Sequence, residues 1–312
     1  MKKQHKIEES KLSNFALYLN KVDAFDAPSS KESHLTIKKL STGNTKANRK
    51  PIPMRTIDGQ SLKFLNSLFW TNIMNRQVEF AKSVCASIIA LTFAHDWRMV
   101  VGLGNPSVYE ASMTLHHTYG FPYIPGSAIK GVVRNWVINK HFNLTEAEQK
   151  GNEEEWSQLK ENKALQDEGF CQLFGCPKDS GRKTSDDKAL AFIGDLIFFD
   201  AYPTASPNIA VDVMTMHYEK YYSEKDPLPP ADWYSPNPIP FLTLKSETNK
   251  LNKFQFIVGL RKGAGTKVKI GQDGCAPLEG DILSIIGCFL KQALTQHGIG
   301  AKTAVGYGYM KG

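Results

Sequence analysis

Apolar residues recur at helical spacing in three stretches of the chain. Residues 62–85 repeat apolar side chains about one turn apart. Residues 127–137 place an apolar face behind Ser127, a residue type suited to an N-cap. Asp281 opens a strongly amphipathic stretch, for which Gly298 is a natural stop. The three predicted faces comprise Leu65, Leu68, Phe69 and Ile73 toward Phe80; Ile129, Val132, Val133, Trp136 and Val137; and Ile282, Ile285, Ile286, Phe289, Leu290 and Ala293.

Four further stretches have the apolar and β-branched character of strands. They cover residues 87–103, interrupted at Asp96, then 189–199, 254–260 and 303–310. Together with the helices at residues 127–137 and after Asp281, they give the order strand, helix, strand, strand, helix, strand. This order predicts an α+β fold with a ferredoxin-like, RRM-like core.

Long polar connections separate these elements. We expect residues 86–312 to form one domain that carries insertions at about residues 142–188 and 203–250. The preceding residues 1–85 are expected to form an N-terminal extension with a basic arm and a helix.

The net charge of +7 is unevenly distributed. Residues 28–63 hold eight basic and two acidic residues, which is nearly the whole excess. This arm is either a solvated linker or a segment that orders on RNA or on a partner subunit, and composition leaves both open. Residues 250–269 hold six basic and no acidic residues and suggest a basic hairpin. Residues 145–170 are acidic and indicate an exposed helix that faces solvent or a basic neighbour.

The chain shows no signal for export, membrane insertion or metal binding. No apolar run approaches the roughly 20 residues that a bilayer span requires, and the N-terminus lacks the apolar core of a secretory signal. Five scattered cysteines are typical of reduced thiols, so we expect a cytoplasmic protein. Cys171 and Cys176 lack further zinc ligands at a recognisable spacing and are expected to be buried, and no cofactor is predicted.

Two segments combine glycine with basic side chains, in residues 100–136 and at the C-terminus. Lys130 and Arg134 are four residues apart and project from the same side of the predicted helix. Glycine permits close backbone approach, and adjacent cations favour an anionic partner such as a phosphate backbone. The candidate residues for such a contact are Ser127, Lys130, Arg134, Gly298, Gly300, Lys302, Gly306 and Gly308.

Each candidate also has an ordinary structural explanation. The glycines after the last helix suit a C-cap and a tight turn. Lys130 and Arg134 suit the solvated face of an amphipathic helix, and Tyr307 suits packing better than base stacking.

Several sequence blocks resemble a known family. PYIPGSAIKGVVR at residues 122–134, paired with GIGAKTAVGYG at residues 298–308, resembles the RAMP superfamily of CRISPR-associated proteins. More narrowly, the order of the blocks is similar to the family of sixth subunits of type III-B (Cmr) effector complexes, from about residue 100 to the end. The further blocks are GLGNPSVYE, CQLFG, GDLIFFDAYP and VDVMTMHYEKYY.

The resemblance implies a non-catalytic subunit of an RNA-guided, RNA-targeting complex. Such a subunit caps one end of the backbone near the 3′ side of the guide RNA, beside other Cmr RAMP subunits, with target RNA as a further candidate partner. The family's RNA-facing elements correspond to Lys130 and Arg134 and to the glycine-rich segment with Lys302.

The sequence also suggests three other classes of function. A P-loop NTPase requires glycine directly before the lysine, whereas Ala301 precedes Lys302. A RAMP-type, metal-independent endoribonuclease that processes guide RNA would use His116 or His117 as acid or base, of which at most one faces RNA in an extended segment. Asp195 and Asp200 do not complete a catalytic constellation, because their odd separation places them on opposite faces of a strand. A protein–protein scaffold remains compatible with RNA binding.

Overall fold

The computed structural model describes residues 66–104, 112–146, 148–149, 151–178, 191–216, 221, 229, 237–247, 251–271 and 278–312. The predicted basic arm at residues 28–63 and the fifth cysteine, Cys275, lie outside these ranges.

Helices and strands alternate along the described chain. The helices are α3 (Ser67–Val84), α4 (Gly126–His141), α5 (Glu153–Gln166), α6 (Glu168–Phe174), α7 (Ile282–Gln296) and the 3₁₀ turn η6 (Thr303–Val305). The strands are β1 (Cys85–His95), β2 (Arg98–Met99), β3 (Gly175–Cys176), β4 (Phe192–Ile193), β5 (Leu196–Phe198), β6 (Tyr202–Pro203), β7 (Ile209–Met216), β8 (Asn237–Lys245), β9 (Lys253–Arg261), β10 (Lys267–Ile270), β11 (Leu278–Asp281) and β12 (Met310–Lys311).

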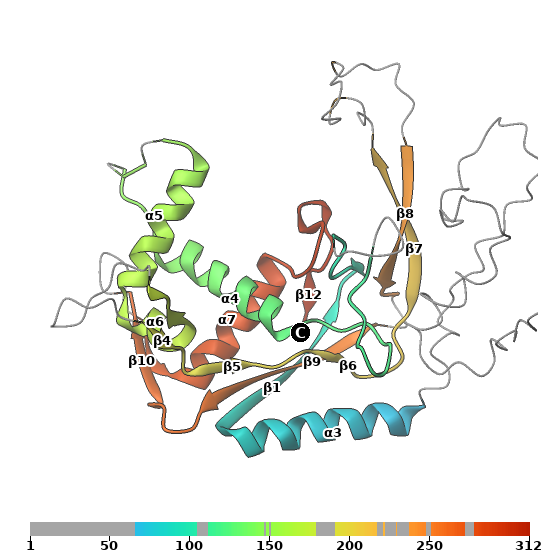
Figure 1. Ribbon diagram of the computed structural model, residues 1–312, viewed down its shortest axis with the longest axis horizontal. Helices are drawn as coiled ribbons and strands as arrows, with labels where there is room; N and C mark the ends of the chain where they lie inside the picture. Colours follow the sequence, from blue (N-terminus) through green and yellow to red (C-terminus); the bar gives the residue numbers. More distant parts are fainter. Residues whose placement is uncertain are drawn as a thin grey trace, which may run out of the picture.

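The main sheet has the strand order β12-β1-β9-β5, with β6 also paired to β9. Every pairing in it is antiparallel. Helices α4 and α7 pack together above this sheet, whereas α3 runs along its other side (Figure 1). The combination of helices with an antiparallel sheet confirms the predicted α+β class.

The core forms where the predicted apolar faces of α4 and α7 meet the sheet. All six predicted positions of α7 are buried. On α4, four of the five predicted positions are buried and Val132 is partly buried. Asp281 is the N-cap of α7, because its carboxylate accepts a hydrogen bond from the Ser284 backbone N–H at 2.9 Å. Gly298 follows the helix with a φ of 76°, as predicted for its stop.

Helix α3 confirms the predicted helix but not its entire apolar face. It contacts β1 and β9, and its buried Trp70 and Ile73 form a separate apolar cluster with Phe121. Leu68 and Phe80, placed on the apolar face by the periodicity, are 63% and 60% exposed. The periodicity therefore predicted where the helix lies more accurately than it predicted which of its side chains are buried.

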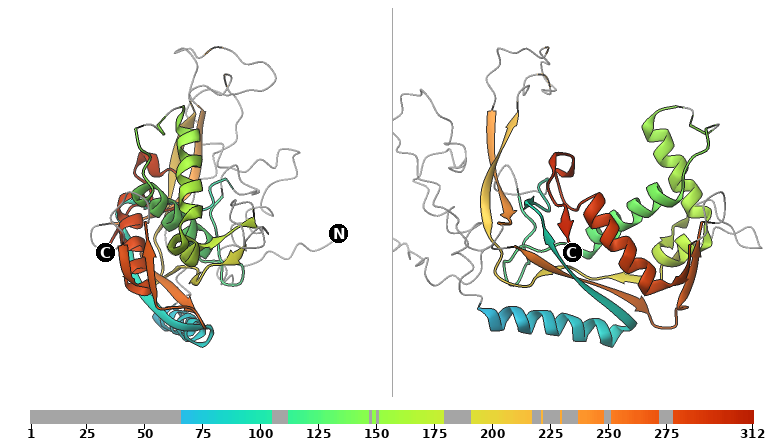
Figure 2. Two further views of the ribbon diagram at one scale, coloured as in Figure 1. Left: turned by 90° about the vertical axis from the view of Figure 1, so that its left-hand side faces the viewer. Right: turned by 180° about the vertical axis from the view of Figure 1, so that it is seen from behind.

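The segments predicted as insertions form further helices and strands, several of whose buried side chains join the main core. Strands β7 and β8 form a long antiparallel pair that β2 extends, and helices α5 and α6 follow α4. Figure 2 shows the β7–β8 pair and α5 projecting at opposite ends of the molecule. No described helix combines the length and apolar character needed to cross a membrane.

Two predictions about strands were wrong. The basic residues after β9 do not form a hairpin with it, because β9 is central and both of its edges are already paired, with β1 and with β5. Strand β10 pairs with β11 instead. Residues 303–310 are not extended, since η6 and a turn occupy most of them and only Met310 begins strand β12.

Candidate nucleic-acid interface

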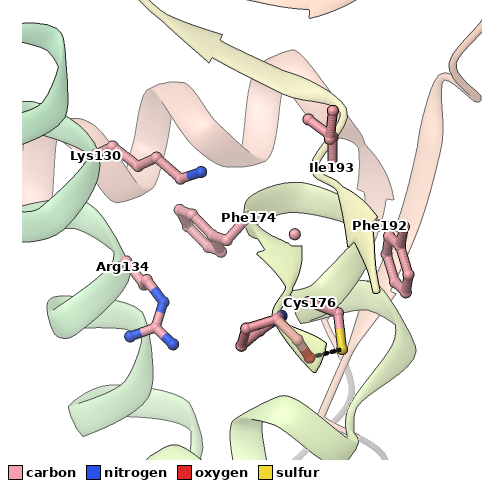
Figure 3. Close-up of a pocket in the computed structure, with 9 residues that line it drawn as sticks. Lys130, Arg134, Phe174, Cys176, Phe192 and Ile193 are labelled. Atoms are coloured by element: carbon pink, nitrogen blue, oxygen red, sulfur yellow. Dashed lines mark hydrogen bonds between the residues drawn. The ribbon is translucent and has the colours of Figure 1, made fainter. Parts of the chain in front are cut away.

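A pocket of about 380 Å³ lies between α4 and the paired strands β3 and β4. Figure 3 shows Lys130 and Arg134 extending from α4 toward the side of the pocket formed by Phe174 and Cys176. The pocket brings together the two cations that the sequence predicted to share a helix face. Its lining comprises Lys130, Arg134, Phe174, Gly175, Cys176, Pro177, Phe192, Ile193 and Gly194.

Lys130 is a partly buried cation. Burial lowers the pKa of its ammonium group, and the nearby charges of Arg134 and Arg261 lower it further. Among the residues that the structure describes, no carboxylate forms an ion pair with Lys130. Three neighbouring positive charges without a full set of counter-charges favour the binding of an anion.

Arg134, in contrast, already has an acidic partner. Its Nη2 donates to Oε1 of Glu161 on α5 at 2.8 Å, and its guanidinium lies 5.3 Å from the ring centroid of Phe170. This contact agrees with the expectation that the acidic segment faces a basic neighbour. The ring and the carboxylate therefore compete with a phosphate in the pocket for the Arg134 guanidinium.

The start of α4 corrects the N-cap assignment of Ser127. Pro125 is the residue at the N-cap position, and Ser127 lies exposed within the first helical turn. The missing cap comes from a distant residue, because Oδ1 of Asp200 accepts a hydrogen bond from the Gly126 backbone N–H at 2.7 Å. A Cβ at Gly126 would collide with the carbonyl oxygen of Phe198, so the helix can begin this close to the sheet only with glycine.

The glycine-rich C-terminal loop packs against the segment after β2. Ala301 N–H donates to the Val100 carbonyl at 2.8 Å, and a Cβ at Gly300 would collide with that same oxygen. Gly308 is equally close to the carbonyl of Ile299. These two glycines are required for packing, Gly298 ends α7, and Gly306 caps η6 with a φ of 93°, so all four candidate glycines have a structural role. Gly306 is exposed, with open space where a side chain would stand.

Lys302 lies at the centre of an aromatic contact within this loop. Its Nζ is 4.9 Å from the ring centroid of Phe241 and 5.9 Å from that of Tyr307. Tyr307 is 6% exposed and donates a hydrogen bond to Asp212, which confirms its predicted packing role. Burial, followed by this carboxylate, raises the pKa of Tyr307 to about 12.

The predicted RNA-binding residues thus occupy two places. Lys130 and Arg134 line the pocket on α4, and none of its lining residues belongs to the glycine-rich loop. Lys302 and the glycines lie against β2, β8 and the segment after β2.

His116 lies in a packed turn among aromatic side chains, as expected for a structural histidine rather than a catalytic one. Its Nδ1 accepts from the backbone N–H groups of Thr118 at 3.2 Å and Tyr119 at 3.4 Å. Burial lowers the pKa of its imidazole. His117, the next residue, is exposed.

The other polar candidates also have structural partners. The Asp195 carbonyl accepts from the Arg261 N–H at 2.8 Å, while the Asp200 carboxylate caps α4. Cys171 and Cys176 are buried, as predicted, and their thiols donate hydrogen bonds to the carbonyls of Leu165 and Pro177. In the described part of the chain, no group of three or more His, Cys, Asp or Glu residues is arranged to hold a metal ion.

Sequence reasoning missed two kinds of site residue. Arg261 and Glu161 belong to the predicted basic and acidic segments, but their positions beside α4 depend on the fold. Trp97 is 48% exposed and directly follows the predicted interruption at Asp96. An aromatic residue at a predicted strand break was the signal available in the sequence.

The comparisons with known proteins agree with this architecture. A family model described as the RAMP superfamily matches residues 97–311, well over half of the chain. The chain belongs to the RAMP superfamily.

The relatives narrow this class further. The chain is 35% identical over 253 residues to "CRISPR system Cmr subunit Cmr6" of Pyrococcus furiosus, covering 71% of this chain and 68% of the relative. It is 24% identical over 234 residues to "CRISPR system CMR subunit Cmr6" of Saccharolobus solfataricus, covering 73% and 59%. The predicted resemblance to the sixth Cmr subunits is therefore confirmed.

Two solved structures are also similar. The crystal structure of Cmr6 from Pyrococcus furiosus matches with 30% identity and a TM-score of 0.38, over 72% of this chain and 98% of that chain. A cryo-EM structure of the type III-B Cmr-beta complex bound to cognate target RNA matches with 20% identity and a TM-score of 0.47, over 96% and 85%.

Proposed function

We propose that the chain is a non-catalytic, RNA-binding structural subunit of a type III-B CRISPR (Cmr) effector complex. In this role it caps the backbone near the 3′ side of the guide RNA, beside other Cmr RAMP subunits, in defence against foreign nucleic acid. The 35% sequence identity to Cmr6 of Pyrococcus furiosus supports membership of such a complex. Lys130 and Arg134, which line the pocket, and the charge of Arg261 near Lys130 carry the RNA-binding part of the proposal.

We also propose that the core is ferredoxin-like. The elements β1, α4, β5, β9, α7 and β12 follow one another in the predicted order. Their sheet order β12-β1-β9-β5 places the first and third strands of that unit at the centre. In this arrangement Lys130 and Arg134, on the polar side of α4, line the pocket.

The chemistry of the pocket suits a phosphate backbone. A phosphodiester would neutralise Lys130, whose charge is disfavoured by burial and by two neighbouring cations. Phe192, which is 37% exposed, lines the same pocket and offers a ring to an adjacent base. Cationic side chains and a nearby aromatic are the usual means of holding single-stranded RNA.

The proposal assigns no catalytic step to this chain. Nδ1 of His116 is occupied by two backbone donors, which limits its use in proton transfer. The endoribonuclease alternative therefore rests on the exposed His117 alone. Incubation of the purified complex with labelled repeat RNA, for the wild type and His117→Ala, should give the same RNA lengths in both samples.

The test of RNA binding is the salt dependence of guide-RNA retention by the assembled complex. Each lost single-strand phosphate contact lowers the slope of log K against log salt by about 0.7. We expect the double variant Lys130→Ala with Arg134→Ala to lower it by about 1.4, two contacts at that value. The matched control, Lys140→Ala with Lys291→Ala, removes two exposed lysines from α4 and α7 and should leave the slope unchanged. Equal slopes for both double variants would refute RNA binding at the pocket.

A further inference from the structure

Trp97 is an exposed aromatic residue held in a fixed orientation. It lies between β1 and β2, and 48% of its surface is exposed. The Tyr307 ring contacts it at a centroid distance of 5.2 Å and an angle of 63°, and the Arg98 guanidinium lies 5.6 Å from its centroid. The Trp97 carbonyl accepts from the Ser246 N–H at 2.8 Å. These contacts orient the indole without covering it.

Lys302 contacts the same tyrosine. Its Nζ is 5.9 Å from the Tyr307 centroid, so Tyr307 contacts both Trp97 and Lys302. Lys302 is the one non-glycine residue with positive φ among the described residues, at 62°. A lysine in this backbone conformation is unfavourable where glycine would be accepted, which indicates that its side chain is needed there.

The charges around Trp97 leave Lys302 without a carboxylate. Arg98 pairs with Asp212 at 3.2 Å, and Lys311 pairs with Asp96. No acid in the described part of the chain pairs with Lys302, whose ammonium instead faces two aromatic rings. The surface therefore combines one oriented, exposed indole with one unneutralised cation.

We propose that Trp97 and Lys302 form a second nucleotide-binding site, in which a base of single-stranded RNA stacks on Trp97 and a phosphate contacts Lys302. This proposal rests on the proposed RNA-binding function, but it uses residues that do not line the pocket on α4. Stacking on an aromatic side chain accepts any base, because every base has a π face. The Lys302 cation, which contacts the tyrosine that packs on Trp97, favours RNA over an apolar protein segment as the occupant.

The experiment uses the assembled complex with its guide RNA and three variants. Trp97→Leu removes the aromatic ring but keeps an apolar side chain, whereas Trp97→Phe keeps a ring. Phe80→Leu is the matched control, since Phe80 is an exposed aromatic on α3, away from both sites. The measurements are the dissociation constant for guide RNA and the yield of ultraviolet cross-links to the peptide that contains residue 97.

A stacked base gives a specific pattern. We expect Trp97→Leu to weaken guide-RNA binding by roughly 5- to 150-fold, the range for loss of one stacked base. Trp97→Phe should keep most of the affinity, and Phe80→Leu should match the wild type. The wild type should give a cross-linked adduct at Trp97.

Three results would overturn the inference or its basis, and they are distinguishable. If Trp97→Leu binds RNA like the wild type while the double variant of Lys130 and Arg134 binds less, the Trp97 site is wrong and the proposed function stands. If Trp97→Leu loses subunits in size-exclusion chromatography and its retained RNA shows the wild-type affinity, Trp97 contacts protein. If the wild-type complex holds no RNA, the proposed function itself fails.

Discussion

Neutralising Glu161 should strengthen RNA binding at the α4 pocket. Its carboxylate holds Arg134 at 2.8 Å, and the two side chains are 47% and 27% exposed. A phosphate entering the pocket must compete with this carboxylate or tolerate its negative charge. The substitution Glu161→Gln removes that charge while keeping the length of the side chain.

The expected gain follows from the exposure of the pair. Solvent-exposed ion pairs contribute about 0.3–1 kcal/mol, and the exposure of Glu161 places this pair in that class. Releasing Arg134 for a phosphate should therefore tighten guide-RNA binding by about two- to fivefold. The assay is the guide-RNA dissociation constant of the assembled complex at fixed salt.

A charge-matched control separates the local contact from the change in net charge. Glu154→Gln removes one exposed carboxylate from the same helix without touching Arg134, and it should leave the dissociation constant nearly unchanged. Weaker binding by Glu161→Gln would refute the reasoning, since it would mean that Glu161 positions Arg134 for RNA. If both variants changed the dissociation constant equally, the effect would come from net charge and not from the contact between Glu161 and Arg134.

Three further predictions concern stability. Asp200→Ala should lower the free energy of unfolding by about 1 kcal/mol through loss of the α4 cap, whereas Ser127→Ala should leave it unchanged. Urea denaturation of both variants measures these two values. Burial lowers the pKa of His95 to about 4, so the unfolded chain gains the proton first and stability should fall by about 3 kcal/mol as pH drops from 6.5 to 4; His95→Gln should flatten this profile. Lys302→Gly removes both an unfavourable φ and a cation–π contact, so the free energy of unfolding should change by less than about 1 kcal/mol. Lys302→Val keeps the unfavourable φ and should lower the free energy of unfolding by more than that. Equal melting curves for the two variants would contradict backbone strain at Lys302.

Local patterns predicted the elements that form the core. The apolar periodicity of α7 and the carboxylate of Asp281 act within a few residues, so both were visible in the sequence. The same holds for the interruption of the first strand near Asp96 and for the shared face of Lys130 and Arg134. The narrower family resemblance came from the order of sequence blocks rather than from periodicity.

Features that depend on distant residues were not predictable. The α4 cap comes from Asp200, 74 positions along the chain, so the nearer Ser127 was the wrong choice. The basic hairpin after β9 was wrong because β9 lies inside the sheet, and local sequence does not tell how many neighbours a strand has. The pairing of Arg134 with Glu161 and the position of Arg261 near Lys130 likewise follow from packing.

In the proposed function, this chain holds guide RNA as a member of a Cmr complex. The most direct test is a tagged pull-down from the native host, with mass spectrometry of the proteins and sequencing of small RNA in the same eluate. We expect several related RAMP subunits together with repeat-derived guide RNA, and less of that RNA at raised salt for Lys130→Ala with Arg134→Ala. Recovery of the partner subunits with the same RNA yield for that variant would contradict RNA binding at the pocket, and recovery of neither partner subunits nor RNA would contradict the assembly.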